Sequence, residues 1–395
     1  MNHPSAVWLA RATASSLLIV GSALLGGCYE RPPVDTVQTG IRGIGDEQVI
    51  NPRLDAIKYK KNQIPEPIPP ADADGPPATL VFQNLKVLKD LNIGQFTRVM
   101  QSMAAWVAPA DQSCNYCHEA VMSSDAKYTK RVARRMLQMV RYINKDWRAH
   151  VGKTGVTCYT CHRGQPVPEY RWFINPGQSS ATGLIAGNAG KNKPSIVAGL
   201  SALPGDPFKD YLLGSENIRV QAGQALRGTD YQSIKQTERT YAFMISITQA
   251  LGVNCSYCHS TRALRAWDQS TPMRATAWYG IRMARDLNNN FMVPLTSTFP
   301  EHRLGVLGDA PKIACITCHQ GVFKPLYGVS MAKNYPELSG GDHPIGGLPP
   351  PTPPGESPAP HEVPPAMFAY PPPATDETPA TPAQTPPTAA LVAPH

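Results

Sequence analysis

The motif C-x-x-C-H occurs four times in this chain of 395 residues, and no other feature constrains the fold as strongly. Its copies, called motifs one to four in chain order, stand at residues 114–118, 158–162, 255–259 and 315–319 and use eight of the 9 cysteines. In this motif two thiols attach a porphyrin, and the adjacent histidine binds its iron. We therefore expect four covalently bound haem c groups.

Haem attachment competes with other uses of paired cysteines. A zinc ribbon needs its cysteine pairs close together, whereas these pairs lie roughly 40 to 100 residues apart and each has its own histidine. A thioredoxin-like pair would occur once, and a disulfide framework is typical of a short chain. The expected haem residues are therefore Cys114, Cys117 and His118; Cys158, Cys161 and His162; Cys255, Cys258 and His259; and Cys315, Cys318 and His319.

The ninth cysteine follows a segment that resembles an export signal. Residues 8–28 read WLARATASSLLIVGSALLGGC, with Arg11 before an apolar run and small residues before Cys28. The pattern predicts a lipoprotein signal peptide over residues 1–27, removed to leave a lipid on Cys28. The alternative is an uncleaved transmembrane anchor, although the run is shorter than the roughly 18 residues of a usual span. Both interpretations place the haem region outside the cytoplasm.

Composition divides the rest of the chain into three parts. Residues 28–78 form an extended proline-containing segment, and residues 341–395 form a proline-rich tail that is expected to be disordered because it cannot bury a core. Between them, residues 79–340 repeat a helix, a loop and a haem motif, in two pairs of repeats. The fold class is thus a mostly α multihaem cytochrome c with irregular loops. Apolar residues at helical spacing predict its helices over 93–109, 125–150, 237–252 and 271–290.

The sixth ligand of each iron decides what a haem can do, because methionine raises the potential and a vacancy permits catalysis. Met244 is the only methionine in the helix over 237–252, so we assign it to haem three. Superposing the repeats places Met100 on Met244, with Met103 opposite Ile247. By the same rule Met136 would ligate haem two. The alternative role for each methionine is to fill the apolar core without binding iron.

The fourth repeat departs from this rule. Aligning its helix with the second one matches Met139 with Met283 and puts Gly280 opposite Met136. Haem four would then lack a methionine of its own, and His150 could supply its sixth ligand. The competing interpretation takes Met139 and Met283 as the ligands and leaves His150 as an ordinary histidine. The same alignment matches two further pairs, Arg141 with Arg285 and Asn144 with Asn288.

These residues closely resemble a known family, the tetrahaem cytochrome c subunit of purple-bacterial photosynthetic reaction centres. The resemblance runs from Cys28 to about Leu338 and rests on the order of several strings: QTGIRG, NLKVLKDL, ARRMLQM, HVGKTGVTCYTCHRG, STPMRATAWYGIRMARDLN and CITCHQGVFKPLYG. It implies Met100, Met136 and Met244 as ligands of haems one to three, and His150 as the ligand of haem four. The loop before Cys114 is about one residue longer than expected, which leaves Met103 as an alternative to Met100.

The resemblance also implies a function in electron transfer and no enzymatic substrate. Such a subunit lies on the periplasmic face of the photosynthetic membrane, held by its lipid anchor. It accepts electrons from a soluble cytochrome c or a high-potential iron–sulfur protein and re-reduces the photo-oxidised bacteriochlorophyll special pair of membrane subunits L and M. Haem three is expected nearest that pair, followed outward by haems four, two and one. Arg274 matches a family arginine that raises the potential of haem three; its alternative role is a surface or propionate-pairing arginine.

Two other predictions concern what the chain does not do. The formal net charge of +8 would be largely offset by haem propionates, so we expect no nucleic-acid partner. The alternative function is an exported multihaem reductase, which would need one haem with an open sixth position. Filling all four positions, as above, favours electron transfer.

Overall fold

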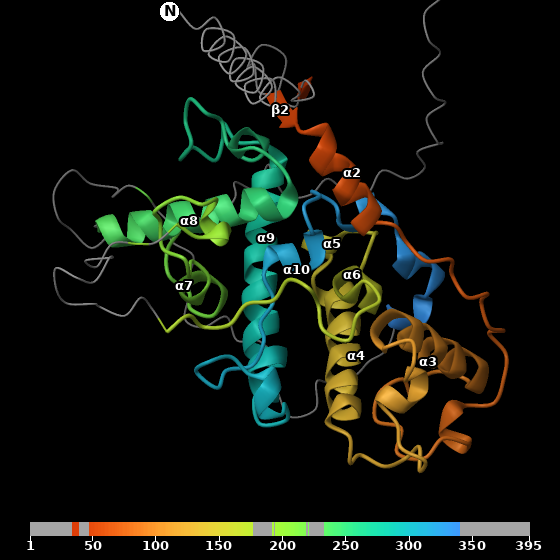
Figure 1. The fold of residues 1–395 in the computed structure, drawn as a ribbon. Helices are drawn as coiled ribbons and strands as arrows, with labels where there is room; N and C mark the ends of the chain where they lie inside the picture. Colours follow the sequence, from red (N-terminus) through yellow and green to blue (C-terminus); the bar gives the residue numbers. More distant parts are fainter. Residues whose placement is uncertain are drawn as a thin grey trace, which may run out of the picture.

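The computed structural model describes residues 34–38, 47–176, 192, 194–218, 220 and 233–339 and is mostly helical with long irregular connections (Figure 1). Strand is confined in these residues to β1 (Asp35–Gln38) and β2 (Glu47–Ile50), an antiparallel pair with Asp35 opposite Ile50. The prediction of a mostly α fold is therefore confirmed. The expected signal peptide, Cys28 and the tail over 341–395 lie outside the described residues.

The segment expected to be extended, 28–78, contains one helix besides the two strands in its described parts, 34–38 and 47–78. Helix α2 (Pro52–Lys61) begins after Asn51, whose side chain accepts a hydrogen bond from the backbone N–H of Arg53. Pro52 suits the first turn because its ring presets a helical φ and the missing N–H has no partner there. None of its residues is buried, so α2 lies along the surface and leads the chain into the helical body.

Four long helices precede the four motifs: α3 (Ile93–Val107), α4 (Tyr128–Asp146), α8 (Ile234–Leu251) and α9 (Pro272–Leu287). Helix α8 begins three residues before its expected start because Ser233 and Gln236 form a capping box. It ends where the sequence predicts, since Gly252 adopts the left-handed conformation that favours glycine. The helix predicted over 125–150 is interrupted at Trp147, after which α5 (Arg148–Val151) carries His150.

Short helical segments complete the described chain. Motifs two and four form the α-helices α6 (Cys158–His162) and α10 (Cys315–His319), and α7 (Lys209–Leu212) lies between the two halves of the sequence. The remaining segments are 3₁₀ turns, except for one π-helical turn, η5: η1 (Ala78–Leu80), η2 (Ser113–Tyr116), η3 (Ile196–Ala198), η4 (Cys255–Tyr257), η5 (Asn288–Met292), η6 (Val293–Leu295), η7 (Glu301–Arg303), η8 (Pro325–Gly328), η9 (Met331–Asn334) and η10 (Pro336–Leu338).

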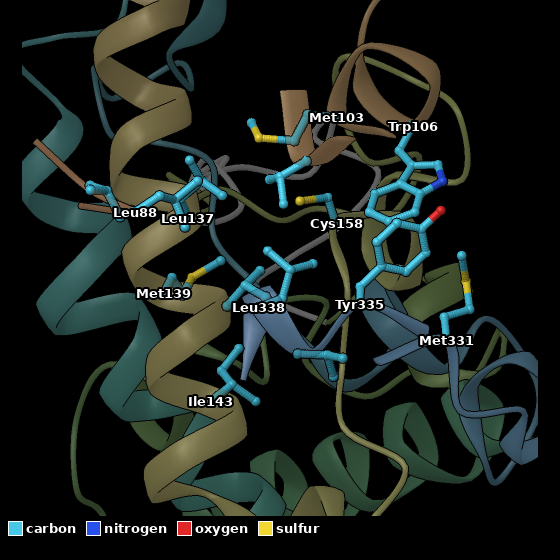
Figure 2. Packing of buried hydrophobic residues seen from close by; sticks show 14 of the residues in the cluster. Leu88, Met103, Trp106, Leu137, Met139, Ile143, Cys158, Met331, Tyr335 and Leu338 are labelled. Atoms are coloured by element: carbon cyan, nitrogen blue, oxygen red, sulfur yellow. The ribbon is translucent and has the colours of Figure 1, made fainter. Parts of the chain in front are cut away.

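Buried apolar side chains of the described residues form two clusters. The first joins α3 and α4 to the last turns of the described chain, and Figure 2 shows Met103, Trp106 and Tyr335 within it around Cys158. The rings of Trp106 and Tyr335 meet edge to face, with centroids 4.7 Å apart. The second cluster joins α7, α8 and α9 through side chains such as Tyr211 and Phe243. The two clusters therefore involve different helices, and the first combines α3 and α4 with residues from the C-terminal part of the described chain.

A buried ion pair fastens the end of the described chain to α3. Arg98 donates from Nη1 to Glu337 at 3.1 Å, and both side chains are at most 5% exposed. The guanidinium also donates to the carbonyls of Ile68 and Asn334 and lies 4.1 Å from the centroid of the Tyr335 ring. Three distant segments thus converge on one side chain.

Within the described residues, no helix has the length and apolar character that crossing a membrane requires.

Candidate functional site

Motifs two and four have nearly the same local structure. In each, the threonine between the two cysteines accepts a hydrogen bond from a backbone N–H that begins the helix: Thr157 to Thr160 at 2.9 Å, and Ala314 to Thr317 at 3.0 Å. Such a bond satisfies a donor that the first turn of a helix leaves without a partner. A five-residue helix is thereby fixed with its cysteines and histidine in place.

Two equivalent asparagines hold the chain that leads into these motifs. Asn144 on α4 donates to the carbonyl of Val156 and accepts from the Val156 N–H, at 2.9 and 2.7 Å. Asn288, after α9, makes the same pair of bonds with Ile313, at 2.9 and 2.7 Å. Both partners stand two residues before the first cysteine of their motif. Each asparagine is buried, so its amide replaces strand pairing for the incoming backbone.

The two motif helices pack against each other. The residues after their histidines, Arg163 and Gln320, both adopt the left-handed conformation. From there Arg163 donates to the carbonyl of Cys318 at 3.1 Å, and Gln320 donates to that of Cys161 at 3.5 Å. The thiol of Cys161 hydrogen-bonds with that of Cys318 and, together with burial, raises the pKa of Cys318. We call this reciprocal contact the junction.

A cavity of about 640 Å³ lies beside the junction, and Cys161 and Cys318 are among its lining residues. This volume lies within the range of cofactor sites. Its walls include both cysteines and the histidine of motif two and of motif four, together with Met136, His150 and Gly280. All eight motif cysteines are free thiols in the structure. The cysteines and histidines of two complete C-x-x-C-H motifs therefore line the same cavity.

The motif histidines are oriented as metal ligands. In each, Nδ1 lies within hydrogen-bond distance of a backbone carbonyl, and a proton held there leaves Nε2 free to bind a metal. The distances to the carbonyl oxygens are 3.1 Å from His118 to Met122, 2.9 Å from His162 to Gln165, 2.8 Å from His259 to Leu264 and 3.0 Å from His319 to Val322.

His150 lies beside His319, although the two are far apart in sequence. Their ring centroids are 6.0 Å apart with the planes at 61°, and Nδ1 of His150 lies 2.9 Å from the carbonyl of Thr276. Burial lowers the pKa of both side chains, that of His319 to about 4, which favours the neutral imidazole that binds metals. Gly280 on α9 makes the room, because a Cβ there would lie 2.5 Å from Cε1 of His150.

The methionines differ in burial. Met103 and Met139 are buried members of the first core cluster, at 8% and 7% exposure, whereas Met100 and Met136 are partly buried at its edge. Met244 has the same edge position in the second cluster. Met136 shares the cavity wall with His162, as do Met103, Met139 and Met283, while Met100 and Met244 lie outside that wall. Helix α3, which carries Met100, packs against η2 of motif one.

These groups fit covalently attached haem. Thiol pairs face a cavity, histidine Nε2 atoms are available, and one buried cation needs an acceptor: Nε and Nη1 of Arg163 have no hydrogen-bond partner among the described residues. A haem would bring carboxylates close to such cations. Residues 30–339 match the family model of the photosynthetic reaction centre cytochrome C subunit. The chain belongs to this family.

Three relatives of the cytochrome subunit carry the same description, photosynthetic reaction center cytochrome c subunit. That of Rubrivivax gelatinosus is 52% identical over 83% of this chain and 89% of its own length. The protein of Thermochromatium tepidum is 47% identical over 82% and 80%, and that of Roseobacter denitrificans is 38% identical over 67% and 74%. Membership of the family implies covalently bound haem c, a role in electron transfer and association with the photosynthetic reaction centre.

Arg274 of this cytochrome subunit lies beside motif three. Its guanidinium carbon is 4.0 Å from the centroid of the Trp267 ring, and Nη1 donates to Ser270 and to the carbonyl of Ala266. Burial lowers the pKa of Arg274 to about 10. Burial, and to a smaller extent the charge of Arg274, lowers the pKa of His259. A positive charge therefore stands next to motif three, and its effect on haem three stays a prediction.

Sequence reasoning missed several residues that shape the site. Asn144 and Asn288 were matched by alignment without a role, and this match of two amide side chains in the helices before motifs two and four could have indicated one. The threonines of motifs two and four stand where motifs one and three have Tyr116 and Tyr257. That difference also indicated a difference in structure. The hydroxyl of a threonine at the third position of a helix can accept a hydrogen bond from the N–H just before the helix, and tyrosine is not suited to this.

Proposed function

We propose that this chain carries four haem c groups and conducts electrons, one at a time, from a soluble periplasmic carrier to the photo-oxidised bacteriochlorophyll pair held by subunits L and M. A small cytochrome c or a high-potential iron–sulfur protein would be the donor. Each bound haem would supply an iron that exchanges one electron. Conduction without chemistry requires protein ligands on both faces of every iron.

The proposed ligands are a motif histidine on one face of each haem and a residue from a long helix or from α5 on the other. The position of His150 is the main observation that supports this ligand set. It is held against His319 by Thr276, and Gly280 leaves the space that it occupies. The pairs are Met100 and His118 for haem one, Met136 and His162 for haem two, Met244 and His259 for haem three, and His150 and His319 for haem four.

The protein's part is to fix these ligands and to keep successive cofactors close. Backbone carbonyls orient the histidines, and the contact between Cys161 and Cys318 supports a short distance between the haems of motifs two and four. Ligands that are held in place limit reorganisation on electron transfer. Arg274 would raise the potential of haem three by disfavouring its oxidised, more positive state.

The test is flash excitation of membranes poised at successive ambient potentials, with haem absorbance as the readout. Four titrating components that become oxidised after the flash are expected. Haem absorbance that does not respond to light would contradict the proposal. A carbon monoxide difference spectrum separates the alternative, a multihaem reductase, because an open haem site binds carbon monoxide and a fully ligated one does not.

His150→Ala tests the ligand set directly. The substitution should change the spectrum of the haem bound at Cys315 and Cys318 and leave that of haem two intact. His302→Ala is the control, because His302 also lines the cavity but is exposed and outside the proposed ligand set. A change confined to haem two after His150→Ala would show the assignment to be wrong.

Attachment to the periplasmic face of the membrane is proposed through a lipid on Cys28, after removal of residues 1–27. An uncleaved N-terminal anchor is the alternative. Mass spectrometry of the mature N-terminus distinguishes them, since a lipidated Cys28 and an intact Met1 differ in both sequence and mass.

A further inference from the structure

The carboxylate of Asp286 on α9 holds the end of α4, in the other half of the chain. Its Oδ2 accepts a hydrogen bond from the hydroxyl of Tyr142 at 2.7 Å and another from Nε1 of Trp147 at 3.0 Å. Its Oδ1 accepts from Nδ2 of Asn290. Both carboxylate oxygens are therefore bonded, and hydrogen bonds to an ionised acceptor are stronger than those between neutral groups.

Trp147 is the residue at which the helix predicted over 125–150 is interrupted. It ends α4, because its N–H donates to the carbonyl of Ile143 at 3.1 Å. It also begins α5, because its own carbonyl accepts from the N–H of His150 at 2.9 Å. A hydrogen bond that fixes the indole of Trp147 therefore fixes the residue from which α5 starts.

Helix α9 contacts the same segment at a second place. The carbonyl of Thr276 lies 2.9 Å from Nδ1 of His150, and Gly280 leaves room for the imidazole. Asp286 follows Thr276 by ten residues, which is about 15 Å along a helix. Residues 147–150 are thus held against α9 at both ends, at the indole of Trp147 and at the imidazole of His150.

The equivalent segment of the fourth repeat has neither of these groups. The alignment that matches Met139 with Met283 places Phe291 opposite Trp147 and Pro294 opposite His150. Phenylalanine has no hydrogen-bond donor in its side chain. The indole donor therefore occurs in the repeat that also supplies a histidine to the opposite half of the molecule.

We infer that Asp286 is a positioning residue for haem four: by holding the indole of Trp147 it fixes α5 and keeps the imidazole of His150 on the iron. This inference rests on the proposed function, which assigns His150 to that haem. Groups that orient a metal ligand affect how firmly it binds, although they do not touch the metal.

The contacts of Asp286 do not depend on the cofactor. Asp286, Tyr142 and Trp147 are not among the residues that line the cavity, and their hydrogen bonds are made with protein atoms. The carboxylate should therefore have the same partners when the haems are bound.

The experiment measures how fast the reduced four-haem chain binds carbon monoxide, because a haem can bind it only when its sixth ligand has left. His150→Ala supplies the difference spectrum of haem four without its ligand. Trp147→Phe keeps a ring and removes the Nε1 donor, and Asp286→Ala removes the acceptor. In both variants the rate at haem four should rise about tenfold, the effect expected from loss of a hydrogen bond to a charged group.

Tyr142→Phe is the matched control. It removes a hydrogen bond to the same oxygen of Asp286, but Tyr142 lies within α4, before the interruption at Trp147. This variant should keep the native rate of carbon monoxide binding. Asp286→Asn retains an acceptor oxygen and should give a rate between those of the native protein and Asp286→Ala. Thermal unfolding of each variant measures its stability separately.

The outcomes separate this inference from the proposed function. A native rate in Trp147→Phe, or an equal increase in Tyr142→Phe, would overturn the role of Asp286. If Asp286→Ala does not accumulate with four haems, the comparison of Trp147→Phe with Tyr142→Phe decides alone. If haem four stayed unreactive in His150→Ala, the ligand assignment of the proposed function would be wrong instead.

Discussion

Motifs two and four, the inner pair, and motifs one and three, the outer pair, share a sequence pattern but differ in structure. The inner motifs are capped α-helices that pack against each other and line one cavity. The outer motifs are single 3₁₀ turns, η2 and η4, and their first cysteines, Cys114 and Cys255, are exposed. The same sequence motif therefore lies beside a cavity in the inner pair and has an exposed first cysteine in the outer pair.

The difference follows from one position in the motif. Thr160 and Thr317 bond back to the backbone and tighten the inner helices, while Tyr116 and Tyr257 fill the same position in the outer motifs with a large ring. Those rings still reach the shared cavity and connect the outer motifs to it. Under the proposed function, the outer pair lies where electrons are exchanged with partners, and the inner pair bridges them.

The largest effect is expected from the asparagines that hold the inner motifs. Asn144→Ala or Asn288→Ala leaves a buried N–H and buried carbonyls without partners and should lower the free energy of unfolding by about 3 kcal/mol. Urea unfolding measures it. The matched control is Asn115→Ala in outer motif one, where the side chain is exposed and the change should stay within about 0.5 kcal/mol. If Asn115→Ala and Asn144→Ala lost the same free energy of unfolding, the inner and outer motifs would not differ in how firmly they are held.

The next largest loss in the free energy of unfolding is expected from Gly280→Ala. The added Cβ would overlap the imidazole of His150, so we expect a loss of about 2 kcal/mol together with a changed spectrum of haem four. Gly94→Ala on α3 is the control, since its Cβ would meet Ala71 at an ordinary 3.4 Å. That variant should be neutral or slightly stabilising. A native spectrum in Gly280→Ala would show that His150 does not need this space.

A smaller effect should come from the caps. Thr160→Ala and Thr317→Ala each remove one helix-starting hydrogen bond and should cost about 1 kcal/mol in thermal unfolding. Tyr257→Phe, at the equivalent outer position, should change stability by less than about 0.5 kcal/mol. If the tyrosine variant lost as much as the threonine variants, the cap would not explain the difference between the pairs.

The smallest effect on stability is expected in the loop after outer motif one, where the carboxylate of Asp125 pairs with Arg134. Hydrogen bonds from Arg134 and then from Asn84 lower the pKa of Asp125 well below its usual value. A depressed folded-state pKa gives stability that is present above the unfolded pKa of about 4 and is lost as the pH falls toward the folded value.

Because Asp125 is 40% exposed, we expect Asp125→Asn to cost only about 0.5 kcal/mol at pH 7. The difference between the variant and the native protein should shrink below pH 4 in thermal unfolding. A difference that is constant from pH 7 to pH 2 would contradict this role for the carboxylate.

The helices could be predicted from sequence because their apolar spacing and their caps are local. The site could be predicted only in part. The alignment placed Gly280 opposite Met136, and the structure places His150 against Gly280. That His150 ligates haem four stays a prediction. The junction could not be predicted, because the contacts of Arg163 with Asn62 and Cys318 join segments whose proximity depends on the packing of both halves.

The space at Gly280 also bears on how the molecule is assembled. The proposed ligand of haem four, His150, lies in the first half of the chain, and Cys315 lies near the end of the folded part. During export the ligand would arrive long before the cofactor that it completes. A C-terminal half made alone should therefore attach haem four yet leave it reactive toward carbon monoxide, and adding the N-terminal half should quench that reactivity. Loss of carbon monoxide binding would then show that the two halves had associated.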